Sequence, residues 1–156
     1  LRNLTITHIL FDVGLRLSEI TNLNMEDIEL GKTAKSSKLR IIGKGNKIRY
    51  LPLGKNSRKW LEEYLSERKL LLKAKEVDIE AVFISNQMKR ISNRSIYRIF
   101  EKFDTNPHAA RHTLLTKLVR NGNDLVTVKE IAGHSNINTT ARYSKPTFEE
   151  LADIIE

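Results

Sequence analysis

The spacing of apolar residues near the start of the chain predicts an α-helix over residues 3–13. Apolar positions recur every three or four residues, which places them on one face of a helix. They are Ile6, Ile9, Leu10 and Val13. Gly14 follows directly, and glycine commonly ends a helix because it adopts left-handed backbone angles at little cost. We expect a second short helical segment over residues 18–23.

The next apolar pattern is typical of β-strands. The runs KLRII, at residues 38–42, and KIRYLPL, at residues 47–53, have strand-like composition. Between them lies the tetrapeptide Gly-Lys-Gly-Asn, at residues 43–46, whose composition favours a tight turn. Residues 27–30 fit a further short strand. The pattern therefore predicts a hairpin within a small antiparallel sheet of two or three strands.

Most of the remaining chain is predicted to be helical. Residues 56–75 are amphipathic, with an apolar side expected to carry Trp60, Leu61, Tyr64, Leu65 and Leu71. Further helices are expected from Ser92 or Asn93 through Phe103, from Pro107 to about Asn121, from Asp124 to near Gly133, and from Asn136 to Tyr143. The expected fold class is α+β, mainly α-helical with one small antiparallel β-sheet, and residues 1–156 are expected to form a single domain.

Residues 147–156 are predicted to form a final helix. Thr147 and Glu150 have the spacing of a capping box, in which the two residues satisfy each other's backbone N–H groups. Apolar residues follow at i, i+3, i+4 and i+7 and form one buried face. They are Phe148, Leu151, Ala152 and Ile155, and Ile154 widens the face. Because so short a helix is not stable alone in water, it needs a groove, either on its own domain or on a neighbouring molecule.

The charge of the chain points to a polyanionic partner. Lysine and arginine number 27 against 19 aspartates and glutamates, a net charge of +8. No acidic residue lies between Leu30 and Leu61 or between Asp104 and Asp124, and a third basic cluster lies over residues 89–98. Three such tracts indicate a surface built for phosphates, and nucleic acid is the commonest ligand of that kind.

Composition also excludes several classes of protein. A chain of 156 residues with 40% hydrophobic residues suits one folded domain and not a disordered tail. The sequence has no cysteine, so disulfides and thiolate metal sites are excluded. It contains no run of 18 apolar residues and opens with no signal peptide. Because Leu1 already lies in a helix-like pattern, we expect the chain to be a fragment of a longer protein.

Six side chains are candidates for holding or attacking a phosphodiester. They are Arg16, Lys44, His108, Arg111, His134 and Tyr143. Glu19 lies three residues after Arg16, a spacing that allows it to orient the arginine. His108 and Arg111 have the same spacing on one predicted helix, and Lys44 lies at the tip of the predicted hairpin. Each residue alone is more often a solvated or packing side chain, so the interpretation depends on the ordered set.

The order and spacing of four motifs resemble the catalytic domain of the tyrosine recombinases, also called the integrase family of site-specific recombinases. The motifs are GLRLSEI, GKGNKIRYLPLG, HAARHT and GHSNINTTARYS. The resemblance runs from about Thr5 to the end of the chain. It implies that Arg16 and Arg111 are the catalytic arginines, Lys44 the hairpin lysine, His108 and His134 the catalytic histidines, and Tyr143 the nucleophile.

This resemblance also implies what the protein does and with what. The expected activity is cleavage and rejoining of double-stranded DNA through a covalent 3′-phosphotyrosine intermediate, with no metal or other cofactor. The expected assembly is a tetramer on DNA, joined by the helix at residues 147–156 docking in trans. The family further implies a prokaryotic cytoplasmic location and an N-terminal core-binding domain absent from this chain.

The chemistry of the candidate groups suits that reaction. Arginine binds phosphate oxygens through bidentate, charge-assisted hydrogen bonds, so two arginines are able to hold the charge of a phosphoryl transition state. A tyrosine hydroxyl has a pKa of about 10 and needs a proton acceptor. Histidine is the commonest residue in that role, and His108 is the candidate here. Lys44 is suited to protonate the leaving 5′-oxygen, and His134 to bond a phosphate oxygen.

Two other functions share parts of this pattern. Residues 128–145 loosely resemble a helix-turn-helix, which would fit a non-catalytic DNA-binding regulator. That reading leaves Arg16, Lys44 and the His108–Arg111 pair unexplained. A type IB topoisomerase uses the same tyrosine chemistry but relaxes supercoils without exchanging strands between partners. A covalent adduct separates an enzyme from a regulator, and junction resolution separates a recombinase from a topoisomerase.

Overall fold

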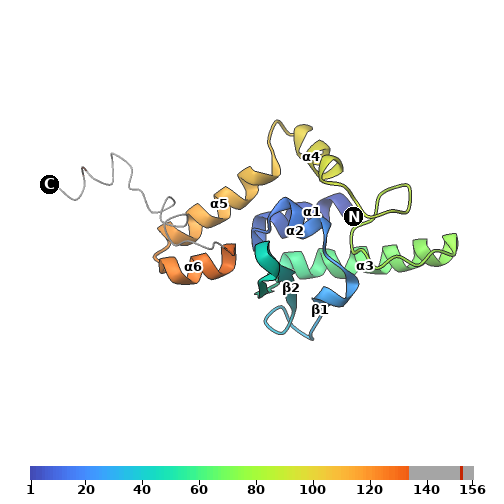
Figure 1. Cartoon of the computed structure of the whole chain (residues 1–156), viewed down its shortest axis with the longest axis horizontal. Helices are drawn as coiled ribbons and strands as arrows, with labels where there is room; N and C mark the ends of the chain where they lie inside the picture. The colour runs from blue at the N-terminus through green and yellow to red at the C-terminus, as the bar shows by residue number, and fades with distance from the viewer. Residues whose placement is uncertain (134–151, 153–156) are drawn as a thin grey trace.

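The computed structural model describes residues 1–133 and residue 152, and it is mainly helical (Figure 1). The helices are α1 (Arg2–Val13), α2 (Leu17–Thr21), α3 (Lys55–Lys75), α4 (Asn93–Glu101), α5 (Pro107–Arg120) and α6 (Leu125–Ala132). The strands are β1 (Ile28–Glu29), β2 (Lys38–Ile42) and β3 (Ile48–Pro52). Short 3-10 turns occupy Met25–Asp27 and Lys44–Asn46. The predicted α+β class is therefore confirmed.

The predicted helix ends follow the local sequence signals. Gly14 ends α1 with φ 74°, and its N–H donates to the Leu10 carbonyl at 3.2 Å. The Ser92 hydroxyl accepts a hydrogen bond from Ser95 at the start of α4. Asn106 caps α5 in the same way, with Pro107 in its first turn. Local capping chemistry therefore fixes these boundaries, as the sequence predicted.

The hairpin and its turn form where the sequence predicted them, and the structure adds the register. The sheet order is β1-β2-β3, with both pairs antiparallel, and β2 pairs with β3 from Lys38 opposite Pro52 to Ile42 opposite Ile48. At the tip, Gly45 has φ 72° and Asn46 has φ 58°, the left-handed angles for which glycine and asparagine are suited. Lys44 consequently lies at the exposed tip.

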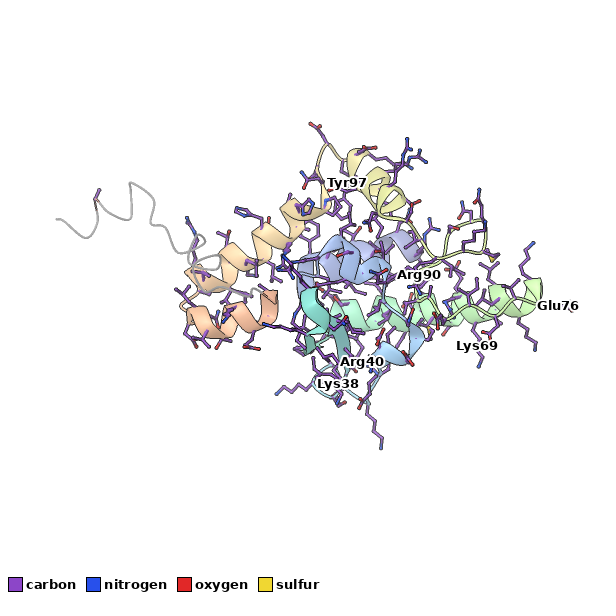
Figure 2. All side chains as sticks on the ribbon, viewed as in Figure 1. Lys38, Arg40, Lys69, Glu76, Arg90 and Tyr97 are labelled. Carbon is purple, nitrogen blue, oxygen red and sulfur yellow. The ribbon has the colours of Figure 1, made fainter. Side chains whose placement is uncertain are left out.

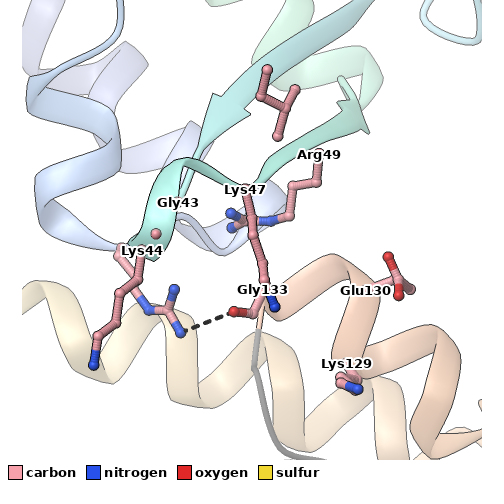
Figure 3. Close-up of a pocket in the computed structure, with 10 residues that line it drawn as sticks. Gly43, Lys44, Lys47, Arg49, Lys129, Glu130 and Gly133 are labelled. Atoms are coloured by element: carbon pink, nitrogen blue, oxygen red, sulfur yellow. Dashed lines mark hydrogen bonds between the residues drawn. The ribbon is translucent and has the colours of Figure 1, made fainter.

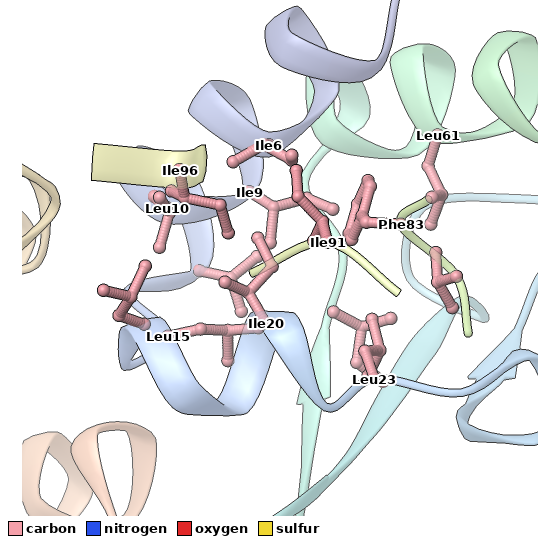
Figure 4. Close-up of a cluster of buried hydrophobic side chains, with 14 of the residues drawn as sticks. Ile6, Ile9, Leu10, Leu15, Ile20, Leu23, Leu61, Phe83, Ile91 and Ile96 are labelled. Carbon is pink, nitrogen blue, oxygen red and sulfur yellow. The ribbon is translucent and has the colours of Figure 1, made fainter. Parts of the chain in front are cut away.

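The main core is centred on α1. Ile6, Ile9 and Leu10 are fully buried, and α1 packs against both α3 and α5. Figure 4 shows these side chains in one apolar cluster that also contains Leu61 and Phe83 from later in the chain. Because α1 contacts helices on either side, it connects the part of the fold that holds the sheet to α5 and α6.

The prediction that Leu71 lies on the buried side of α3 is wrong. Leu71 is 37% exposed, whereas Leu72 is buried at 8%. Arg68 occupies the intervening part of the inward face and is itself buried, because its guanidinium donates to the carbonyls of Ile79 and Ala81. A polar position in the sequence therefore faces inward, and the apolar face is displaced by one residue toward the end of the helix.

Two helices beside the main body form a smaller apolar cluster. Leu115 of α5 packs with Val128 and Ala132 of α6. Figure 1 shows α5 and α6 together at the side of the molecule opposite the free end of α3. Apart from residue 152, the segments predicted over residues 136–143 and 147–156 lie outside the described residues. No helix within residues 1–133 is both long enough and apolar enough to cross a membrane.

Candidate active site

Arg16 is held at the beginning of α2 by Glu19. The Arg16 backbone N–H donates to Glu19 Oε2 at 2.8 Å, which caps the helix. The guanidinium Nη1 also lies 3.5 Å from Glu19 Oε1. The spacing seen in the sequence therefore brings these two side chains together, and the carboxylate fixes both the backbone and the side chain of the arginine.

Glu19 makes its strongest contacts with Arg49, a residue not selected from the sequence. Arg49 Nη1 and Nη2 donate to the two Glu19 carboxylate oxygens at 2.8 and 3.0 Å. The side chains are only 11% and 3% exposed, respectively. Burial alone would raise the pKa of the Glu19 carboxyl, but the bonds and charges of Arg49 and Arg16 outweigh it and lower this pKa. Glu19 is therefore an anion at neutral pH.

Arg111 joins the ends of two helices. It is buried, and its Nη1 donates to the Gly14 carbonyl while Nη2 donates to the Ala132 carbonyl, both at 2.6 Å. Gly14 follows α1 and Ala132 ends α6. The guanidinium therefore lies between the core helix of the fold and the segment that leads to His134.

Three arginines meet at the end of α6 and bind successive carbonyls. Arg49 Nε donates to the Ile131 carbonyl at 3.2 Å, Arg111 to Ala132 as described, and Arg16 Nη2 to Gly133 at 3.4 Å. The last of these bonds is the dashed line in Figure 3. The last carbonyls of a helix lack internal partners and carry partial negative charge, so cations suit this position.

A basic cavity opens beside these arginines. It has a volume of about 430 Å³ and lies between the hairpin tip and the end of α6 (Figure 3). Its basic lining residues are Arg16, Lys44, Lys47, Arg49 and Lys129. Lys44 and Lys47 have no carboxylate partner within the described part of the chain. The cavity therefore presents positive charge to an anion.

His108 lies in a different environment from Arg111. It is exposed in the first turn of α5, and its ring centroid is 6.1 Å from that of Tyr97 on α4. Tyr97 is labelled in Figure 2, beside the start of α5. Among the described residues, neither His108 nor Arg111 is part of the cavity lining. The candidates His134 and Tyr143 lie outside the described residues.

The acid-free tract between residues 30 and 61 is partly neutralised in space. Four of its basic residues pair with carboxylates that flank the tract in sequence. The pairs are Lys38 with Glu29, Arg40 with Asp27, Arg49 with Glu19, and Arg58 with Glu62. Figure 2 shows Lys38 and Arg40 at the sheet, on the side of the molecule away from Tyr97. The tract therefore offers phosphates fewer cations than its sequence indicates.

The sequence contained one signal for Arg49. Alternate residues of an extended chain face the same side, so Lys47, which directly precedes β3, is expected on the same side as Arg49 within β3. This face leads from the hairpin tip toward Arg16, where the cavity lies. Within residues 1–133, no cluster of three or more histidine, aspartate and glutamate side chains is arranged to hold a metal ion.

Gly133 is expected to be sensitive to substitution because Arg49 lies against it. Its φ is 67°, and a Cβ added there would lie 2.8 Å from Arg49 Cζ. Gly122 is a matched control, since its φ is 86° and a Cβ would meet nothing within 4 Å. We expect Gly122→Ala to lower the free energy of unfolding by about 1 kcal/mol and Gly133→Ala by about 2–4 kcal/mol, because overpacking adds to the backbone strain.

Urea denaturation of both glycine variants measures this difference. Equal losses of stability would contradict the close packing of Gly133 against Arg49.

Comparison with known proteins gives a consistent family match. Residues 1–150 match the model of the phage integrase family. Tyrosine recombinase XerC of Proteus mirabilis is 37% identical over 164 residues, which cover 99% of this chain and 51% of the relative. Tyrosine recombinase XerC of Histophilus somni (strain 2336) is also 37% identical over 164 residues, covering 100% of this chain and 53% of the relative.

Solved structures show the same fold. The XerA recombinase matches with a TM-score of 0.77 and 28% identity, over 96% of this chain and 55% of that chain. The XerH site-specific recombinase bound to its difH substrate, in a pre-cleavage complex, matches with a TM-score of 0.78 and 26% identity, over 99% of this chain and 46% of that chain. The chain thus spans about half the length of the relatives it matches.

Proposed function

Because the chain belongs to the phage integrase family, we propose that it is the catalytic domain of a site-specific recombinase that cleaves and rejoins double-stranded DNA. The observation that carries the proposal is the convergence of Arg16 and Arg111 on the end of α6, beside a basic cavity that includes Lys44. Two fixed guanidinium groups next to a cationic cavity suit one phosphodiester better than a string of separate phosphates.

In the proposed reaction, the Tyr143 hydroxyl oxygen attacks the scissile phosphorus. A bond forms between this oxygen and phosphorus, and the bond from phosphorus to the 5′-oxygen breaks. His108 takes the tyrosine proton and Lys44 gives a proton to the leaving oxygen. Arg16 and Arg111 stabilise the phosphate charge, and His134 bonds a phosphate oxygen. Attack by another strand's 5′-hydroxyl on the phosphotyrosine reverses the step and joins the strands.

Glu19 supports this arrangement without touching DNA. Its carboxylate caps α2 through the Arg16 N–H and attracts the Arg16 guanidinium. The lowered pKa keeps it charged, so the attraction persists at neutral pH. This chemistry uses protein groups for every proton transfer and draws on no metal or other cofactor.

A covalent adduct tests the proposal directly. A duplex nicked close to the cleavage site loses a short product strand on cleavage, so the phosphotyrosine intermediate accumulates. Denaturing electrophoresis then shows a protein–DNA band whose linkage maps to one tyrosine by mass spectrometry. A chain that binds the duplex but forms no such band would be a DNA-binding regulator. An adduct without resolution of a four-way junction would indicate topoisomerase chemistry instead.

The finer proposal concerns assembly on DNA. The amphipathic residues 147–156 form a helix that docks in trans on a neighbouring protomer within a tetramer, in the cytoplasm where the DNA substrate lies. Deleting residues 147–156 is expected to leave binding to a single site intact and to reduce the two-site synaptic complex at least tenfold. Gel-shift titration with one-site and two-site DNA measures both. A large fall in melting temperature of the free monomer would mean instead that the helix packs in cis.

A further inference from the structure

Arg49 contacts three separate parts of the candidate site. Its two terminal nitrogens bind both oxygens of Glu19, which holds Arg16. Its Nε donates to the Ile131 carbonyl near the end of α6. Its guanidinium also lies against Gly133, close enough that no Cβ fits there without movement. One side chain on β3 therefore ties the hairpin to α2 and to the residue preceding His134.

These contacts require an arginine. The planar guanidinium is able to make two parallel bonds to a carboxylate while its Nε–H points elsewhere, whereas a lysine ammonium is a point charge without this fork. The pair is also largely buried, with Arg49 11% and Glu19 3% exposed. A buried carboxylate that loses its partner carries an uncompensated charge, so it would attract the remaining nearby cation more strongly. That cation is Arg16, 3.5 Å away.

We propose that Arg49 is a positioning residue for DNA cleavage. Arg49 neutralises the charge of Glu19, so that Glu19 orients Arg16 without binding its guanidinium fully. Arg49 also binds the end of α6 and thereby fixes the backbone position that directly precedes His134. The two effects preorganise phosphate-binding groups on both sides of the cavity before DNA arrives. The inference rests on the proposed recombinase function, because it assigns Arg49 a role in that reaction.

A second buried arginine provides a matched control. Arg68 on α3 is also buried and also donates to two backbone carbonyls, those of Ile79 and Ala81. It lies on α3, whose free end is on the opposite side of the molecule from α6 (Figure 1). Replacing Arg68 by lysine therefore disturbs a comparable structural contact without touching the candidate site.

The cleavage rate of Arg49→Lys at saturating DNA is the main test. We expect it to fall about 10- to 100-fold, since a misplacement of about 1 Å in a reacting group has an effect of this size. The DNA dissociation constant should change much less. Arg68→Lys should lower the melting temperature yet cleave at the wild-type rate per folded molecule. A cleavage rate for Arg49→Lys equal to that of Arg68→Lys would overturn the proposal.

A double-mutant comparison identifies the route of the effect. If Arg49 acts through Glu19, Glu19→Gln combined with Arg49→Lys should cleave no more slowly than the worse single variant. Independent, multiplying losses would overturn this route. Should Arg49→Lys fail to fold, the pair Glu19→Gln and Arg49→Met removes both charges together, so no uncompensated charge remains, and it takes the place of Arg49→Lys in the rate assay.

Hydrogen exchange gives a readout that does not depend on catalysis. Backbone amides over residues 129–133 should exchange faster in Arg49→Lys than in wild type, with no change in Arg68→Lys. Unchanged exchange would overturn the proposed fixing of α6. If wild type forms no covalent adduct while hydrogen exchange responds as expected, the recombinase proposal fails. The positioning role of Arg49 in DNA cleavage then fails as well. If wild type cleaves and Arg49→Lys cleaves equally well, only the positioning role fails.

Discussion

Tyr143→Phe is expected to abolish the covalent protein–DNA product while leaving DNA binding in place. The substitution removes one oxygen atom, and that oxygen is the only atom of the side chain able to bond to phosphorus. The positive charge of the domain does not change, so attraction to the phosphate backbone persists. Incubation with the nicked duplex, followed by denaturing electrophoresis, measures the adduct, and a native gel shift measures binding.

Tyr50→Phe is the matched control for this experiment. Tyr50 lies on β3 and is 59% exposed, so its hydroxyl is accessible to solvent but has no proposed part in the reaction. This variant should form the adduct at the wild-type rate. A tyrosine-linked band in Tyr143→Phe would show that another residue is the nucleophile, and loss of DNA binding would show that the hydroxyl contributes to affinity.

Lys44→Ala is expected to slow cleavage of ordinary DNA by about 10²- to 10⁴-fold, the usual contribution of a general acid. Without Lys44 the 5′-oxygen leaves as an unprotonated alkoxide, which is a poor leaving group. A 5′-phosphorothiolate substrate removes this need, because sulfur leaves readily as a thiolate. Cleavage of the sulfur substrate by Lys44→Ala should therefore approach the wild-type rate.

The other lysine of the hairpin separates acid catalysis from charge. Lys47 also lines the cavity, and Lys47→Ala removes the same charge three residues away. Its effect should be equal on the oxygen and sulfur substrates, because binding electrostatics do not depend on the leaving group. Equal losses on both substrates in Lys44→Ala would assign Lys44 to phosphate binding and leave the acid unidentified.

Local sequence patterns determined the elements that carry the site. Apolar spacing and Gly14 defined α1, and the Gly-Lys-Gly-Asn turn placed Lys44 at the hairpin tip. Pro107 set the start of α5 and hence the position of Arg111. These features depend on contacts between residues a few positions apart, so the sequence contains the information needed to predict them. The Arg16–Glu19 contact is predictable for the same reason, being three residues apart.

Only the tertiary structure decided which distant groups meet. Arg49 pairs with Glu19 across 30 residues, and Arg111 reaches the Gly14 carbonyl across 97. No local rule predicts such partners, because they depend on how the sheet and α5 pack around α1. Packing also determined that Leu71 faces outward. It paired cations of the acid-free tract between residues 30 and 61 with carboxylates that lie outside the tract in sequence. The residue types of the site could therefore be predicted from the sequence, whereas the arginine that links them depends on long-range packing.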